Sequence, residues 1–298
     1  MVARYTPRLF SFAVAASLAV LAGCDTGEPP SAVEQIAVPI TELVANRVDA
    51  DLSKPDTGAS YWNSAKPGLV KLLAQPMVTP RPEVVLTEDL EVQTVNDGKH
   101  IAFRLRWKDT ERSEAGRLGE YSDAVAVQFP VGKDPLPSVM MGAKGQPVHI
   151  FHWRAQYQLD AAKGKPSMTD LYPNASIDMY AMDFHDAPGG SKEDQEMFNP
   201  GVALGNPQSS RRSAVDEIIA EGFSTSAVQA PNGSAGFGDW KDGYWTVVIT
   251  RPLAIEGGST IVSGGENSLA FAVWQGGAGE VGSRKSLLMM WTPLVVNG

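Results

Sequence analysis

The sequence predicts a mainly β protein, an antiparallel β-sandwich with long loops and one or two short helices. Segments of strand character recur along the chain, and turn residues separate them. The 29 glycines and 21 prolines among 298 residues suit a loop-rich β protein better than a helical bundle. Strands do not alternate with helices, which excludes a parallel α/β sheet. A chain of this length can bury a full hydrophobic core.

The first segment is predicted to be a signal for export. Arg4 and Arg8 precede an apolar run over residues 9–21, which is shorter than a membrane span. The run ends in Leu-Ala-Gly-Cys24, the pattern of a bacterial lipoprotein cleavage site. We therefore expect residues 1–23 to be a lipoprotein signal peptide and Cys24 to be the lipidated N-terminus. The alternative is an ordinary signal peptide followed by an incidental cysteine.

A lipid on Cys24 would hold the protein on the periplasmic side of a bacterial membrane without spanning it. Asp25 resembles the inner-membrane retention signal of enterobacteria. Asp25 therefore favours anchoring in the inner membrane, and the outer membrane is the alternative. Residues 24–47 are mostly polar and are predicted to form a tether, and residues 48–298 to form the folded domain.

Within that domain the predicted strands follow one another with little helix between them. Residues 83–95 and 100–107 flank Asn96-Asp97-Gly98, a turn signal, and predict a hairpin. The other predicted strands cover residues 123–130, 147–159, 177–184, 243–252, 268–274 and 286–296. Residues 210–223 are predicted to be a helix, because Val215, Ile218 and Ile219 share one face and Gly222 is a fitting stop.

Composition excludes several functions. The formal charge is −9, and no basic patch indicates a nucleic-acid partner. A single cysteine rules out an intrachain disulfide, a cysteine zinc site, an iron–sulfur cluster and a haem attached through Cys-x-x-Cys-His. The spacing of Gly277, Gly279 and Gly282 matches a dinucleotide fingerprint, but no helix and acidic residue follow as that fingerprint requires. His149 and His152 point to opposite faces of a strand and cannot easily hold one metal.

Two further residue types could bind a metal-containing cofactor. Met140 and Met141 precede a predicted strand, where methionine is usually core filler but can also ligate haem iron. Lys285 lies in the glycine-rich loop of residues 276–285, where a lysine is usually a surface charge. The residues alone leave both alternatives open.

Four segments together resemble the haem-b-binding domain of ethylbenzene dehydrogenase and its relatives, the γ subunits of dimethylsulfide dehydrogenase, selenate reductase and chlorate reductase. The likeness covers roughly residues 48–298. The segments are DAVAVQFP at residues 123–130, MGxxGxPVxIxHW at 141–153, DGYWTVVI at 242–249, and FAVW at 271–274 with the loop to Lys285 and Ser286.

The resemblance implies a β-sandwich that holds one non-covalent haem b and has no substrate chemistry of its own. Such a subunit passes electrons between a molybdenum catalytic subunit of the dimethylsulfoxide reductase family, with its iron–sulfur subunit, and an outside donor or acceptor. A c-type cytochrome or a quinone-linked protein is a candidate for that outside partner.

In the family, a methionine and a lysine hold the haem iron, and the matching positions here are Met141 and Lys285. Met140 is the alternative to Met141. We expect only one of the two methionines to reach the iron, because neighbours in an extended chain point to opposite faces. Lys285 would have to be a neutral amine to ligate iron. The lipoprotein signal departs from the family, whose γ subunits are generally soluble. The runner-up interpretation is a haem-free lipoprotein that binds a carbohydrate or another ligand.

Overall fold

The computed structural model describes residues 38–114, 116–166, 168–174, 201, 204–206, 208–209 and 211–298. Within the chain, Gln35–Gly298 form one compact unit. The expected signal peptide, Cys24, most of the expected tether and the strand expected over residues 177–184 lie outside the described residues.

Strands dominate the described part of the chain, as the sequence predicts, and the helices are short. In chain order the elements are β1 (Val38–Pro39), β2 (Leu43–Arg47), the 3-10 helix η1 (Ser60–Ser64), β3 (Gly68–Lys71), β4 (Leu73–Ala74), β5 (Asp89–Asn96), β6 (His100–Lys108), β7 (Ala124–Pro130), β8 (Val148–Arg154), α1 (Ala155–Lys163), α2 (Met168–Leu171), β9 (Val215–Ala220), β10 (Ala227–Val228), β11 (Ala235–Lys241), β12 (Tyr244–Pro252), β13 (Asn267–Trp274), β14 (Ser286–Leu287) and β15 (Thr292–Val296).

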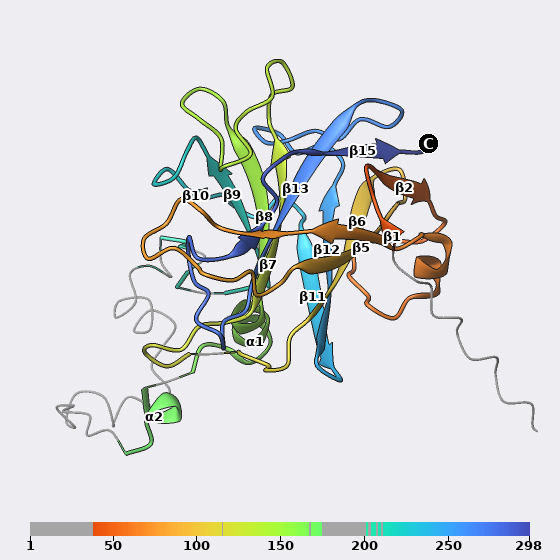
Figure 1. Cartoon of the computed structure of the whole chain (residues 1–298). Helices are drawn as coiled ribbons and strands as arrows, with labels where there is room; N and C mark the ends of the chain where they lie inside the picture. The colour runs from red at the N-terminus through yellow and green to blue at the C-terminus, as the bar shows by residue number, and fades with distance from the viewer. Residues whose placement is uncertain are drawn as a thin grey trace, which may run out of the picture. The chain divides into compact units, whose positions relative to one another are not determined.

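The strands are joined into one sheet whose main path runs β10-β9-β8-β7-β13-β15-β2-β5-β6-β12-β11. Most neighbours are antiparallel, but β1 with β3, β15 with β2, and β2 with β5 are parallel pairs. Figure 1 shows β7 and β8 beside β13 in one half of the sheet and β6 beside β12 in the other. The predicted sandwich is therefore confirmed in outline, with a mixed rather than purely antiparallel sheet.

The core lies between these two halves. The ring of Phe103 on β6 lies 5.7 Å from that of Phe129 on β7. Trp153 on β8 and Trp245 on β12 meet edge to face with ring centroids 5.2 Å apart. A Cβ at Gly238 would lie 2.4 Å from Trp153, so the tryptophan fits only because β11 carries glycine there. Large aromatic side chains thus join the two halves into a sandwich.

Several predicted elements match the structure. The hairpin is β5 and β6, which pair antiparallel on either side of the predicted turn. Asp97 closes that turn by accepting backbone N–H groups of Lys99 and His100, and Gly98 takes a positive φ of 85°. Strands were also predicted correctly at β7, β12 and β13.

Other predictions were wrong. The helix expected over residues 210–223 is not found in residues 211–223, which the structure describes: Val215–Ala220 form β9, which pairs with β8. The strand expected over 147–159 ends at Arg154, and α1 follows. The strand expected over 286–296 divides into β14 and β15. The sheet also begins before residue 48, because β2 in the expected tether pairs with β15 and β5.

Every residue of β7 is buried, which shows that both faces of this half of the sheet are covered. One face packs into the sandwich core, and loops cover the other. Within the described residues, no helix is both long and apolar enough to cross a membrane.

Candidate functional site

The outward face of three paired strands forms the base of a cavity. Because side chains alternate along a strand, every second residue of β7, β8 and β13 points to this face. The ladder places Ala126 between His152 on β8 and Ala272 on β13, and Ala124 between Arg154 and Trp274. Ala270 lies one step further along β13, beside Gln128. We call Ala124, Ala126, Ala270 and Ala272 the alanine floor.

The alanine floor is flat because its side chains are single methyl groups. Loops rise around it from residues 75–78, 139–141, 223–226 and 280–288. They enclose a cavity of about 680 Å³ with mostly apolar walls, which include Ile150, Phe271 and Leu287. This volume lies within the roughly 300–1,000 Å³ of ordinary cofactor and ligand pockets. The space suits a planar, largely apolar group.

Met140 and Met141 both line this cavity. The expectation that only one of them reaches the iron was based on an extended chain, and this premise was wrong because the segment is a turn. Met141 has a φ of 69°, in the left-handed region that non-glycine residues rarely occupy. Gly222 donates its N–H to the Met141 carbonyl, which fixes the turn against the end of β9. Of the two methionines, Met141 is the one that packs on the buried cluster around Ala124, Ala126 and Trp274.

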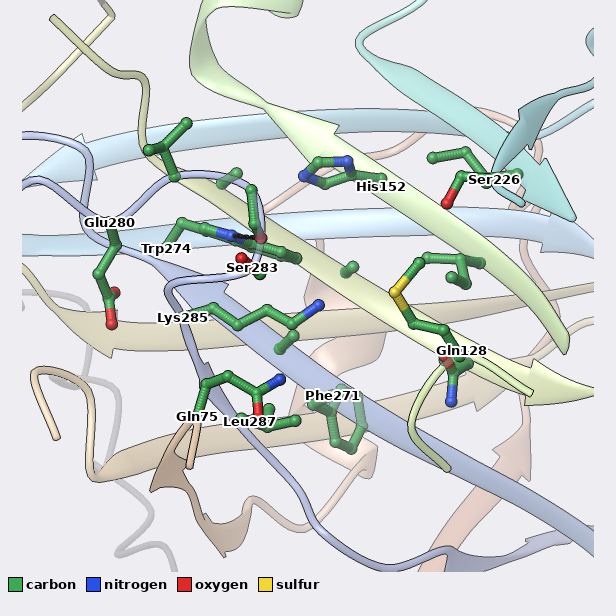
Figure 2. Close-up of a pocket in the computed structure, with 18 of the residues that line it drawn as sticks. Gln75, Gln128, His152, Ser226, Phe271, Trp274, Glu280, Ser283, Lys285 and Leu287 are labelled. Carbon is green, nitrogen blue, oxygen red and sulfur yellow. Dashed lines mark hydrogen bonds between the residues drawn. The ribbon is translucent and has the colours of Figure 1, made fainter. Parts of the chain in front are cut away.

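Lys285 lies on the wall of the same cavity. Figure 2 shows its side chain extending into the cavity, with Trp274 on one side and Gln75 on the other in this view. Its Nζ lies 4.9 Å from the centre of the Trp274 ring. The Gln75 backbone N–H donates to the Lys285 carbonyl, and the next residue, Ser286, pairs with β4 and β13. The backbone of this lysine is therefore held by the sheet itself.

Burial lowers the pKa of Lys285 to about 8, from an ordinary value of 10.5. Desolvation disfavours the ammonium form, and no carboxylate in the described part of the chain forms an ion pair with this amine. A neutral amine carries a lone pair that a metal can accept. The environment thus moves Lys285 toward the protonation state that a ligand needs.

The two strand histidines face opposite sides, as predicted. His149 points into the sandwich core, where Ser259 donates its backbone N–H to Nδ1 at 3.2 Å. His152 lies on the cavity side, and its ring is 4.7 Å from that of Trp274. Burial, with Arg154, Lys285 and Arg211 nearby, lowers the pKa of His152 well below its ordinary value. His152 is therefore a neutral residue of the cavity wall. The sequence had singled it out only as a possible metal ligand, and its place in the cavity was not predicted.

Trp274 and Arg154 were also missed by sequence reasoning. Trp274 ends β13, and its indole N–H donates to the Gly282 carbonyl at 2.9 Å. It thereby ties the glycine-rich loop to the strand beside Lys285. Arg154 ends β8 and lines the polar end of the cavity with Ser122 and Gln156. The strand register places both residues beside Ala124, and the sequence does not reveal that register.

The described residues contain no group of three or more His, Cys, Asp or Glu side chains that could hold a metal ion. The cavity instead offers methionine thioethers, among them those of Met140 and Met141, and the Lys285 amine beside a flat apolar floor. These residues fit a haem, whose flat macrocycle needs such a space and whose iron accepts axial ligands of these types.

Comparison with known sequences identifies related proteins. A sequence model of the family described as Ethylbenzene dehydrogenase matches residues 59–286. A protein of Haloferax mediterranei named as a respiratory nitrate reductase haem subunit is 25% identical over 92% of this chain and 80% of its own length. The chlorate reductase subunit gamma of Ideonella dechloratans is 25% identical over 93% of each chain. The dimethylsulfide dehydrogenase subunit gamma of Rhodovulum sulfidophilum is 25% identical over 68% of this chain and 59% of its own.

Solved structures with some similarity include a family 9 carbohydrate-binding module of Caldicellulosiruptor kristjanssonii. In complex with cellotriose it has a TM-score of 0.41 at 7% identity, covering 86% of this chain and 93% of that chain. In complex with glucose the TM-score is 0.39 at 8% identity, covering 86% of this chain and 95% of that chain.

Proposed function

Because the chain belongs to the ethylbenzene dehydrogenase family, we propose that it binds one haem b and serves as an electron-transfer subunit of a molybdenum oxidoreductase. The relatives named as haem and gamma subunits of reductases and a dehydrogenase support this role. Bound haem would supply reversible one-electron chemistry. The protein's own task is to bind the cofactor, exclude water from it and hold its axial ligands.

The observation that carries the proposal is that one cavity joins the alanine floor, Met141 and Lys285. These residues are far apart in the sequence and come from different elements. The floor leaves room for a flat macrocycle, and apolar walls favour its burial. Met141 and Lys285 are the proposed axial ligands, with Met140 as the alternative to Met141.

The ligand chemistry is consistent with this assignment. A methionine thioether is a soft ligand, and in cytochromes it raises the reduction potential of the iron. The lowered pKa of Lys285 reduces the cost of removing its proton before coordination. The single cysteine, Cys24, cannot form a Cys-x-x-Cys-His attachment, so the haem b would be bound non-covalently.

The proposed partners follow from the same family role. They are a molybdenum catalytic subunit and an iron–sulfur subunit on one side, and a c-type cytochrome or quinone-linked protein on the other. Lipid on Cys24 would place the subunit on the periplasmic side of a bacterial membrane, and Asp25 favours the inner membrane. A membrane-anchored subunit of this kind could exchange electrons close to the quinone pool.

Reconstitution tests this function. The haem-free chain is titrated with haemin while the Soret band is followed, and the complex is then cycled with a reductant and an oxidant. We expect saturation at one equivalent and a reversible one-electron change. Ala126→Trp would place a large ring on the alanine floor and should prevent binding, whereas Val44→Trp on the exposed face of β2 should not. A colourless chain that binds an oligosaccharide would instead support the carbohydrate-binding alternative.

A further inference from the structure

The polar end of the cavity carries an arginine whose charge has no carboxylate partner in the described part of the chain. Arg154 lines the cavity at the end of β8. Its Nε donates to Nε2 of His152 at 3.4 Å, and its guanidinium lies 4.8 Å from the centre of the Tyr157 ring. Both neighbours are neutral, so neither compensates the charge.

Two carboxylates near this end of the cavity, those of Asp216 and Glu120, already have partners. Arg211 stacks on the same Tyr157 ring at 3.5 Å, and it forms a buried ion pair with Asp216. Gln208 also donates to Asp216, which occupies its second oxygen. Glu120 at the rim lies 3.8 Å from Arg117. Arg154 and Arg211 therefore share the Tyr157 ring, and of these two only Arg211 forms an ion pair in the described part of the chain.

The guanidinium groups of Arg154 and Arg211 both lie on the Tyr157 ring. The polar end of the cavity is therefore positive near Arg154, while the alanine floor beside it is apolar. A guanidinium in such a place binds a carboxylate strongly, because its planar donors match the two oxygens and little water competes.

We propose that Arg154 binds a carboxylate substituent of the group that occupies the cavity, which for haem is a propionate. The inference rests on the proposed function and adds the residue that orients the macrocycle. Met141 and Lys285 would hold the iron, and Arg154 would decide which edge of the ring faces the polar end. Arg154 is a binding residue for the periphery of the cofactor and not a ligand of its iron.

The test compares haem with its dimethyl ester, which has the same ring and iron but no free carboxylates. The dissociation rate of each compound is measured by its transfer from this protein to excess apomyoglobin. The association rate with the haem-free protein is measured separately, and the ratio of the two rates gives the affinity. A hydrogen-bonded charge pair contributes about 1.5–3 kcal/mol, so Arg154→Gln should weaken haem binding roughly 10- to 100-fold. The same variant should change binding of the dimethyl ester less than about threefold. Arg154→Lys should keep part of the affinity, because it keeps the charge but not the planar donors.

Arg106→Gln is the matched control. Arg106 also stacks on a tyrosine, with its guanidinium 4.1 Å from the Tyr244 ring, but it lies on β6 and pairs with Glu91. It should leave both affinities unchanged. Equal loss of haem and ester binding in Arg154→Gln would show a structural role and overturn the proposal, as would no loss of either. A wild-type chain that binds neither compound would overturn the haem function itself.

Discussion

Replacing Lys285 by methionine should make the haem-free protein more stable. The pKa of this lysine falls from 10.5 to about 8 because the cavity wall desolvates the ammonium group. A change of one in a pKa corresponds to about 1.4 kcal/mol. Keeping the proton on this amine at neutral pH therefore lowers the stability of the folded state by about 3 kcal/mol. Solvent that reaches the half-buried side chain reduces the expected effect to about 1.5–3 kcal/mol.

The pH dependence has a definite sign. Between about pH 8 and 10.5 the unfolded chain keeps the Lys285 proton and the folded chain does not. The stability of the wild type therefore rises with pH across this window, and Lys285→Met lacks that rise. The variant should be more stable at pH 7, and its advantage should shrink as the pH approaches 10.5.

Urea unfolding of the haem-free wild type and variant at pH 7 and at pH 10 measures this difference. The contributions of other titrating groups to the free energy of unfolding cancel when the two proteins are compared at the same pH. Lys144→Met serves as the control, because Lys144 is exposed in the neighbouring loop and should change stability by less than about 0.5 kcal/mol. An advantage of Lys285→Met that is absent, or equal at both pH values, would refute the idea that the cavity desolvates this amine.

The remaining predictions concern a buried carboxylate, a tryptophan beside Lys285 and the lipid anchor. Burial and the neighbouring Asp123 raise the pKa of Asp109 to about 7, so folded Asp109 retains its proton where the unfolded chain loses it. The stability of the wild type should therefore fall as the pH rises from about 4 to 7. Asp109→Asn should show a smaller fall in its urea unfolding midpoint over the same range. Equal pH dependence of the two proteins would contradict this prediction. Trp274→Phe removes the hydrogen bond to Gly282, which is worth about 1 kcal/mol, and should speed haem loss several-fold. Trp240→Phe removes an indole hydrogen bond of the same length outside the cavity and should leave haem loss unchanged. Cys24→Ser should abolish membrane partition, and a wild-type N-terminus found elsewhere without lipid would exclude the anchor.

The sequence predicted elements whose local signals agree with their tertiary environment. The sequence of the β5–β6 hairpin has two segments of strand character joined by an Asn-Asp-Gly turn, and the structure contains both strands and the turn. β9 was predicted as a helix because Val215, Ile218 and Ile219 fit a helical spacing. In the structure β9 pairs with β8, and Glu217 is buried with Asn232 and Ser234 as partners. Long-range pairing therefore overrode a short local pattern.

The site was predictable only in part for a similar reason. Met141 and Lys285 came from the family resemblance, and the structure places both in the lining of one cavity. The alanine floor, Trp274 and Arg154 depend on how β7 pairs with β8 and β13, which no local signal specifies. The expectation that only one of Met140 and Met141 reaches the iron was argued from an extended chain, whereas the chain turns at Met141, which has a positive φ.

The axial ligand pair is the central claim, and the optical and electron paramagnetic resonance spectra of the haem-loaded protein test it most directly. The wild type should be six-coordinate and low-spin, and Met140→Ala should remain so. Met141→Ala and Lys285→Ala should each open one axial position and give high-spin or ligand-exchanged spectra. A low-spin signal that survives both of these replacements, or that disappears with His152→Ala instead, would contradict the account.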